Sequence, residues 1–270
     1  MNQKYRVWYD GDTHKVTINC YPSDVHEGMS TMVVDSMVDE ARRVMHIAGV
    51  SDDVISRIRK AGPVTRTSLY RGKSHKEPDG LIEFKDPASI HAGRIALEVG
   101  FSQSYSSLQR ATLWWIEQKK ATVAVMLCLT EIEKSSSEVR RQFGSIEELT
   151  LLRTTNTGAS HIRAAQYNGY KWFGILRDAF FETYHQTDCG VIKSEPVYLV
   201  KDAVDITESI PSDLTVTVGD FVPYGWVNDD DVRRLAVKFL QPKPLMEELS
   251  DAVVSTALQR VQDAFEVQQE

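Results

Sequence analysis

The sequence has few cysteines and no long apolar segment, and both shortages restrict the class of protein. Its 270 residues include Cys20, Cys128 and Cys189, which lie far apart and form no C-x-x-C pair. This spacing argues against a disulfide framework and against structural zinc. No apolar run approaches the ~20 residues of a transmembrane helix, and the opening segment MNQKYRVWYDGD has no apolar secretory region. We therefore expect an intracellular protein, cytoplasmic or nuclear, without a membrane partner.

An excess of positive charge is also missing. The 31 lysines and arginines are outnumbered by 38 aspartates and glutamates, which gives a net charge of −7. This balance argues against a general, tight coat on nucleic acid, because such binding depends on cationic contacts to phosphates. A local basic surface remains compatible with it. The length and the 42% hydrophobic content favour a globular protein with one large or two small domains.

Two short apolar runs in the first half of the chain carry acidic residues. Gly80–Phe84 directly follows Asp79, and Ile95–Val99 contains Glu98. Both runs are rich in Ile, Leu and Val and are bounded by Pro or Gly, so they predict strands. The connection Lys85–Arg94 contains Pro and Gly and predicts a loop between neighbouring strands. If the two strands pair, the two carboxylates lie side by side.

Adjacent carboxylates suggest a cation. They repel each other and are costly to desolvate unless a positive charge lies between them. Mg²⁺ (or Mn²⁺) fits such a place, because it takes oxygen ligands from one or two carboxylates and keeps several waters. A metal there can activate water and hold a phosphate oxygen. The alternative is that Asp79 and Glu98 each occupy an exposed strand end.

The order of these features resembles the PD-(D/E)xK nuclease superfamily. Pro78-Asp79 is followed by Glu98 on an apolar strand, and then by a predicted helix, Ser104–Gln118. The segments EPDG and IALEVGFSQSYSSLQRATLWWI are most similar to fungal members of uncertain role, which carry an EVGxS strand and a Trp-Trp helix. The pair His26-Glu27, at the opening of the first helix, is similar to them as well.

This resemblance implies an α/β/α restriction-endonuclease-like core with a mixed sheet, and hydrolysis of phosphodiesters in DNA or RNA. It implies Mg²⁺ or Mn²⁺ bound by Asp79 and Glu98, helped by the Val99 carbonyl. Glu27, in the first turn of the first helix, is a further candidate ligand. A favourable interaction of its negative charge with the positive, N-terminal end of the helix dipole explains a glutamate at this position equally well.

The sequence departs from the superfamily at the position two residues after Glu98. A lysine there orients the attacking water and stabilises developing charge, but this chain has Gly100. Substitutes are Arg110, which is too basic to abstract a proton, and Lys85, in a Glu-Phe-Lys run. Gln109 is a candidate for orienting water or metal ligands, although a capping box with Ser106 also explains it. Gly100 favours the alternative of a catalytically impaired nuclease fold that binds nucleic acid or a protein.

A basic segment precedes Asp79. No acidic residue lies between Val54 and Lys76. Basic residues beside a metal site suit a phosphodiester substrate, since Lys and Arg hold its backbone; a solvated surface is the alternative. The candidate nucleic-acid-binding residues are Arg57, Arg59, Lys60, Arg66, Arg71, Lys73 and Lys76.

The remaining patterns predict four segments. These are a β-hairpin at 1–24, a nuclease-like core at 25–133, a β-rich extension of the core at 134–225 and a helical segment at 226–270. The predicted helices are Val25–Ile47, Val54–Ala61, Asp229–Leu240 and Leu245–Val267. The predicted strands are Tyr5–Tyr9, Lys15–Tyr21, Thr122–Ile132, Ile146–Arg153, Pro196–Val200, Leu214–Val218 and Asp220–Val222.

The aromatic region Ala164–Thr187 is ambiguous between helix and strands, and its β-forming residues favour strands. An aromatic cluster is usually core or subunit interface. A homodimer through this region or through Leu245–Val267 is therefore a possible assembly. Trp114 and Trp115 are expected to be packing residues.

Overall fold

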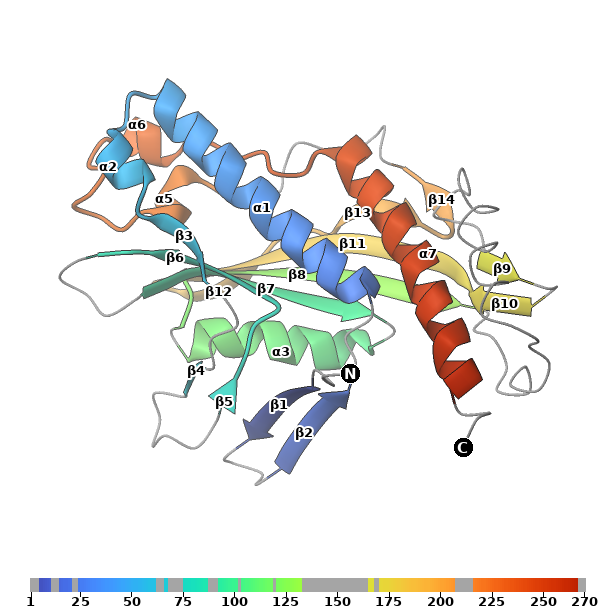
Figure 1. Ribbon diagram of the computed structural model, residues 1–270. Coiled ribbons are helices and arrows are strands. Elements are labelled where there is room, and N and C mark those ends of the chain that lie inside the picture. Colours follow the sequence, from blue (N-terminus) through green and yellow to red (C-terminus); the bar gives the residue numbers. More distant parts are fainter. Residues whose placement is uncertain are drawn as a thin grey trace.

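The computed structural model describes residues 5–10, 15–20, 24–61, 66–67, 75–86, 92–101, 103–118, 120–132, 165–167, 170–206 and 216–266. It shows a mixed α/β protein, as expected. An eight-stranded sheet is covered by helices α1 and α7 on one face and by α3 on the other (Figure 1). Most neighbouring strands are antiparallel, and one central pair is parallel.

The centre of the main sheet contains the two acidic runs. Three antiparallel strands lead into α3 (Tyr105–Glu117), and the next strand returns parallel to the last of them. In sheet order these strands are β3 (Ile58–Ala61), β6 (Gly80–Phe84), β7 (Ala92–Phe101) and β8 (Val123–Ile132). The predicted strands at 80–84 and 122–132 are confirmed, and the strand predicted at 95–99 extends further in both directions.

The second half of the aromatic region continues the same sheet, whereas its first half, residues 165–173, forms a separate two-stranded sheet. β11 (Ile175–Thr187) pairs antiparallel with β8 along most of its length. The preference for strands in this region is therefore confirmed, and Phe180, Phe181 and Tyr184 are buried. The other strands of this part are β9 (Ala165–Tyr167), β10 (Tyr170–Phe173), β12 (Gly190–Lys193), β13 (Val197–Lys201) and β14 (Val204–Asp205).

Two long helices cover one face of the main sheet. α1 (Asp24–Ile47) and α7 (Pro242–Glu266) pack against each other, and both predicted helices are confirmed (Figure 1). α7 begins at Pro242, because the first helical turn tolerates a residue without an amide hydrogen. Its apolar residues, among them Leu249 and Val253, are buried within the same chain. A homodimer through α7 stays a prediction, and the apolar stripe that suggested it already has an intramolecular partner.

A second, smaller sheet lies on the side of α3 (Figure 1). β1 (Tyr5–Asp10) and β2 (Lys15–Cys20) form the predicted antiparallel hairpin. The sheet is completed by β5 (His75–Lys76), which pairs with β1, and by β4 (Arg66–Thr67). The chain therefore enters the smaller sheet between β3 and β6 and then returns to the main sheet.

Three predicted elements are wrong. The helix at 54–61 is instead α2 (Asp52–Ile55) followed by β3, because residues 58–61 pair with β6. The strand predicted at 220–222 lies largely in α5 (Val218–Phe221), whose capping box joins Thr217 and Asp220. The helix predicted at 229–240 is limited to α6 (Asp230–Arg233).

The short extent of α6 has a physical cause. The buried Arg233 guanidinium donates to the carbonyls of Val222 and Val227, and Ala236 forms a bridge with Thr217. These contacts hold the following residues in a non-helical path. The predicted strand at 146–153 lies outside the described residues. Of the strand predicted at 214–218, residues 214 and 215 also lie outside them, and the described part is not a strand, because Thr217 forms only an isolated bridge and α5 begins at Val218. In the described part of the chain, no helix combines the length and apolar character that a membrane span requires.

Candidate functional site

Asp79 lies at the bend that begins β6, beside the backbone of β7. Its Oδ2 accepts a hydrogen bond of 2.6 Å from the Val99 amide and lies 3.0 Å from Nε2 of His26, on the first turn of α1. The neighbouring Gly80 allows α1 to approach, since a Cβ there would lie 2.4 Å from Cγ2 of Val34. The expected pairing of the two acidic strands is therefore confirmed, and the Asp79 carboxylate contacts the residue that follows Glu98.

Glu98 points to the other side of the sheet, toward α3. Its Oε1 accepts a 2.5 Å hydrogen bond from the indole Nε1 of Trp115 and lies 2.8 Å from Nζ of Lys76. The Glu98 side chain is only 8% exposed, so the ammonium and the indole replace solvating water. Oε2 takes part in neither contact. Trp115 packs as expected, and its indole also binds this carboxylate, which sequence reasoning did not predict.

The two carboxylates are close along the backbone but contact different elements. Asp79 contacts α1, while Glu98 contacts α3 and β5. Among the residues that the structure describes, no group of three or more His, Cys, Asp or Glu side chains is placed to hold a metal ion. Mg²⁺ needs only one or two carboxylates from a protein, because water and substrate phosphate complete its shell. In this arrangement the two carboxylates do not lie side by side as expected, because each is beside a basic side chain on its own side of the sheet. A shared magnesium site therefore stays a prediction.

The glycine at the lysine position has a structural cause. A Cβ on Gly100 would lie 2.4 Å from Cδ2 of Leu108, which is 1% exposed in the core beneath α3. Carbon atoms pack at about 3.5–4.0 Å, so any larger side chain here requires the buried Leu108 side chain to move. The close packing of α3 against β7 thus disfavours a lysine at this position.

The structure does not bring Lys85 to the two carboxylates. Lys85 is exposed and directly follows the last residue of β6, whereas Asp79 directly precedes the first residue of the same strand. At ~3.3 Å per residue the two positions are about 20 Å apart along the strand. Arg110 is exposed on α3. Lys76 is instead the cation that contacts Glu98, although the sequence indicated it only as a nucleic-acid-binding residue.

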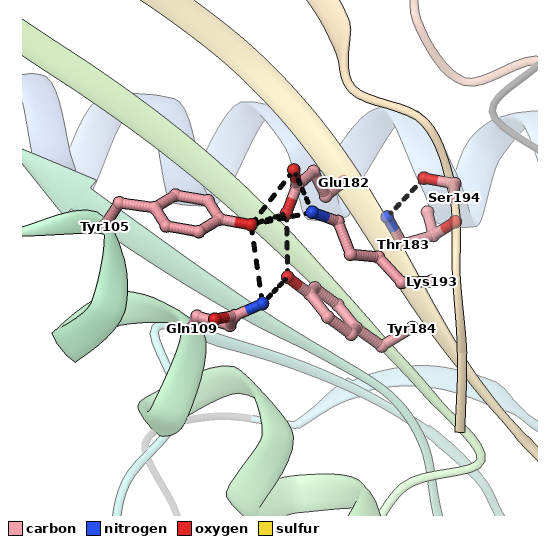
Figure 2. A network of polar contacts seen from close by, with 7 residues as sticks. All are labelled: Tyr105, Gln109, Glu182, Thr183, Tyr184, Lys193 and Ser194. Atoms are coloured by element: carbon pink, nitrogen blue, oxygen red, sulfur yellow. Dashed lines mark hydrogen bonds and ion pairs between the residues drawn. The ribbon is translucent and has the colours of Figure 1, made fainter. Parts of the chain in front are cut away.

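Gln109 belongs to a different polar cluster. The residue before α3 is Ser104, which makes no side-chain capping bond, so the capping box of Ser106 and Gln109 is wrong. Gln109 Nε2 instead lies 3.4 Å from the hydroxyls of both Tyr105 and Tyr184 (Figure 2). The N-cap, Ser104, lies two residues before Ser106, so Ser106 is inside the helix, and Gln109 contacts Tyr184 of β11.

The centre of that cluster is Glu182, on β11. Its buried carboxylate accepts hydrogen bonds from Tyr105 (2.9 Å) and Tyr184 (2.7 Å) and lies 2.8 Å from Nζ of Lys193, on β12 (Figure 2). Burial, and then the hydrogen bond to Glu182, raise the pKa of Tyr184. Burial lowers the pKa of Lys193, but the hydrogen bonds to Glu182 and Tyr105 outweigh it, so the pKa is raised overall. We call these residues the Glu182 cluster.

The Glu182 cluster and Glu98 lie on the same face of the sheet. Glu98 pairs with Met126 on β8, and Met126 pairs with Glu182 on β11. Paired residues share a face, so the two buried glutamates are separated by two strand spacings, about 10 Å. The sequence offered one signal for this cluster, an acidic residue inside the aromatic run FFETY. Its partners on α3 and β12 could be found only from the tertiary structure.

Glu27 lies elsewhere on α1. It lines a cavity between α1 and α7, together with Glu248 of α7 and acidic residues of α1 such as Asp35 and Glu40. His26, the preceding residue, contacts Asp79, and successive helical residues point in different directions.

The predicted basic segment is divided. Arg57 pairs with Asp53 and lies over the Trp226 ring, while Lys60 pairs with Asp35. Arg59 is exposed on β3. The side chain of Arg66 and all of Arg71 and Lys73 lie outside the described residues. A continuous phosphate-binding surface therefore stays a prediction.

Comparisons with protein-family models, with curated proteins and with solved structures found no match to this chain.

Proposed function

We propose that the chain is a metal-dependent phosphodiester hydrolase of DNA or RNA, built on a PD-(D/E)xK-like core. The order of elements supports this proposal: α1, three antiparallel strands β3, β6 and β7, then α3, and β8 parallel to β7. A helix on each face of this unit gives the α/β/α layering that the resemblance implies (Figure 1). Strands β11 to β14 extend the same sheet.

One observation carries the proposal. The Asp79 carboxylate accepts the amide of Val99, so an acid at the start of one strand lies against the backbone beside Glu98 on the next. Both side chains are under 10% exposed. Two nearly buried acids on adjacent strands are costly to keep for stability alone, which favours a functional reason for their presence.

Asp79 and Glu98 are the residues that would hold a divalent cation, which would require the Glu98 carboxylate to turn from Trp115 and Lys76 toward Asp79. When bound, that cation would lower the pKa of a water and polarise a phosphate oxygen. The Val99 carbonyl is a further oxygen ligand of the right type. Glu27, which lines the cavity between α1 and α7, is a weaker candidate.

The chain's own groups orient the two acids. His26 and the Val99 amide fix Asp79, while Trp115 and Lys76 fix Glu98. Such contacts reduce the reorganisation that binding a cation and a phosphate requires.

The test compares charge-removing variants at these acids with a matched control. Asp79→Asn and Glu98→Gln should abolish Mg²⁺- or Mn²⁺-dependent cleavage of plasmid, single-stranded DNA or RNA. Glu182→Gln, which changes a buried glutamate on the same face two strands away, should retain it. Cleavage that is absent from the wild type, or unchanged in both site variants, refutes the proposal.

Gly100 supports a second candidate, a nuclease-like fold that binds nucleic acid without cleaving it. The same experiment separates the two functions. Binding that weakens steeply with salt, without cleavage at any metal concentration, would favour the binding module.

A further inference from the structure

Three aromatic rings form a row on the face of the main sheet that carries α3. Tyr105 is the first residue of α3, Phe180 lies on β11, and Tyr198 pairs with Phe180 from β13. The ring centres of Tyr105 and Phe180 are 6.3 Å apart, and those of Phe180 and Tyr198 are 5.0 Å apart. We call these three residues the aromatic row, which extends from α3 across β11 to β13.

Both ends of the aromatic row are accessible to solvent. α3 packs on β7 and β8 and contacts β11 at its start, whereas β13 packs against β11 and β14. Tyr105 is 38% exposed and Tyr198 is half-buried, while Phe180 is buried between them. Accessible tyrosine rings on a sheet face suit the stacking of another flat ring, because every nucleobase has a π-face.

A lysine ammonium lies over each end of the row. Nζ of Lys193 is 5.4 Å from the ring centre of Tyr105, and Nζ of Lys201 is 5.1 Å from the ring centre of Tyr198 (Figure 2 shows the first pair). Both lysines are exposed. Flat rings beside exposed cations match the chemistry of single-stranded nucleic acid, whose bases can stack and whose phosphates require positive charge.

The acids near the row are less exposed than its cations. The Lys193 side chain is 39% exposed, whereas that of its partner Glu182 is 3% exposed. A second pair on β11 has the same arrangement, with Arg177 at 49% and Asp178 at 15%. An exposed acid, Asp202, lies in the turn after β13. This face therefore presents more cation than carboxylate to solvent, although the chain carries a net charge of −7.

We propose that the aromatic row and its two lysines bind single-stranded DNA or RNA. The inference rests on the proposed function for the nucleic-acid class, and it adds the form of the strand and a surface apart from Asp79 and Glu98. A base stacks on a tyrosine more strongly than an exposed ammonium does. A base therefore takes the place of the Lys201 ammonium over Tyr198, and that ammonium turns to a phosphate.

A duplex does not fit this surface. Its bases are stacked on one another, so their faces cannot reach a protein ring, whereas the bases of a single strand can be splayed out. The aromatic row therefore discriminates between the two forms by access to the base faces, and not by sequence.

The test measures binding by fluorescence anisotropy in EDTA, so that divalent metals take no part. The ligands are a labelled oligothymidine of about 12 nucleotides, an oligouridine of the same length and a duplex of that length. Tyr198→Leu removes one end ring, and Tyr198→Phe keeps it. The matched control is Tyr224→Leu, because Tyr224 is 77% exposed and lies 3.8 Å from the Arg233 guanidinium, in the segment after α5 on the side of α1.

The wild type should bind both single strands more tightly than the duplex. Tyr198→Leu should raise the dissociation constant by about 5-fold or more, the loss of one stacked base. Tyr198→Phe and Tyr224→Leu should bind as the wild type does. Lys201→Met should weaken binding and reduce the slope of log K against log salt by about 0.7, the contribution of one phosphate contact. Lys201 is exposed, so this variant tests the surface even if Tyr198→Leu fails to fold.

Four results would overturn the inference. They are a duplex bound as tightly as the single strands, wild-type affinity in both Tyr198→Leu and Lys201→Met, an equal loss in Tyr224→Leu, and a dimer in light scattering that Tyr198→Leu separates. The last result would show that a second copy of the chain covers the row.

The proposed function fails separately. A protein that binds single strands through the row but cleaves nothing with Mg²⁺ or Mn²⁺ keeps this surface and refutes the hydrolase. A protein that cleaves nucleic acid while Tyr198→Leu and Lys201→Met bind normally keeps the hydrolase and refutes this surface.

Discussion

Gly100→Ala should destabilise the protein, although alanine is intrinsically more favourable than glycine within a strand. The new methyl would lie 2.4 Å from Leu108 Cδ2 and 3.0 Å from its Cδ1 and Cγ. An ordinary carbon contact is about 3.5–4.0 Å, so Leu108 must move by more than 1 Å. Leu108 is 1% exposed and packs with Ala96 and Trp115, so it has little free space.

The expected size follows from two opposing effects. Overpacking a well-filled core costs about 1–3 kcal/mol, and the smaller entropy of the unfolded chain returns about 0.4–1 kcal/mol. We therefore expect the free energy of unfolding to fall by about 1–2 kcal/mol, measured by urea denaturation followed by circular dichroism. Gly28→Ala is the control: its Cβ would meet Oε1 at the mobile end of Glu248, at 2.7 Å. This change lies within α1 and should stabilise by about 0.5–1 kcal/mol.

A double-mutant cycle tests the physical cause. Leu108→Ala alone should cost about 2–5 kcal/mol, because it leaves a cavity. Combined with Gly100→Ala, it should cost less than the sum of the two by about 1 kcal/mol or more, since the added methyl enters that cavity. A neutral Gly100→Ala, or a strictly additive double variant, would refute the explanation for the missing lysine.

Further predictions concern buried charges and thiols. Arg260→Met should lower the free energy of unfolding by about 3–5 kcal/mol, because it leaves the fully buried Glu131 carboxylate without its 2.7 Å partner; an unchanged urea midpoint would contradict this. The pKa of Lys193 is raised above the ordinary 10.5. Its stabilising charge is therefore fully present below that pH and lost as the pH rises through the raised pKa. Lys193→Met should flatten the loss of stability at alkaline pH, and an unaltered profile would count against the ion pair. Cys189 is exposed, whereas burial raises the pKa of the Cys128 thiol. In a Cys20→Ser background, a thiol reagent should modify Cys189 rapidly and Cys128 only on unfolding, and equal rates would show that this core is open.

Elements with a clear apolar pattern could be predicted closely from the sequence. Residues 80–84 and 122–132 are strands because continuous Ile, Leu and Val runs suit a sheet covered on both faces. Residues 58–61 were mistaken for helix because their pairing with β6 is a tertiary contact. The helix predicted at 229–240 failed for a similar reason. Its early end depends on hydrogen bonds from the buried Arg233 to the carbonyls of Val222 and Val227, and the local sequence pattern does not reveal such bonds.

The same limit applies to the candidate site. The neighbouring positions of Asp79 and Glu98 follow from two strands joined by a short connection, and pattern alone indicates them. The lysine that contacts Glu98 could not be found in this way, because Lys76 belongs to a second sheet formed with the N-terminal hairpin. Trp115 was correctly expected to pack, but its hydrogen bond to Glu98 depends on how α3 is rotated over β7.

The measurement that tests the central claim most directly is the anomalous diffraction of a crystal soaked in Mn²⁺. The account predicts one strong peak within about 2–2.5 Å of carboxylate oxygens from both Asp79 and Glu98. A peak that contacts only one of these residues, a peak confined to the cavity lined by Glu27, or no peak at all would contradict a shared metal site.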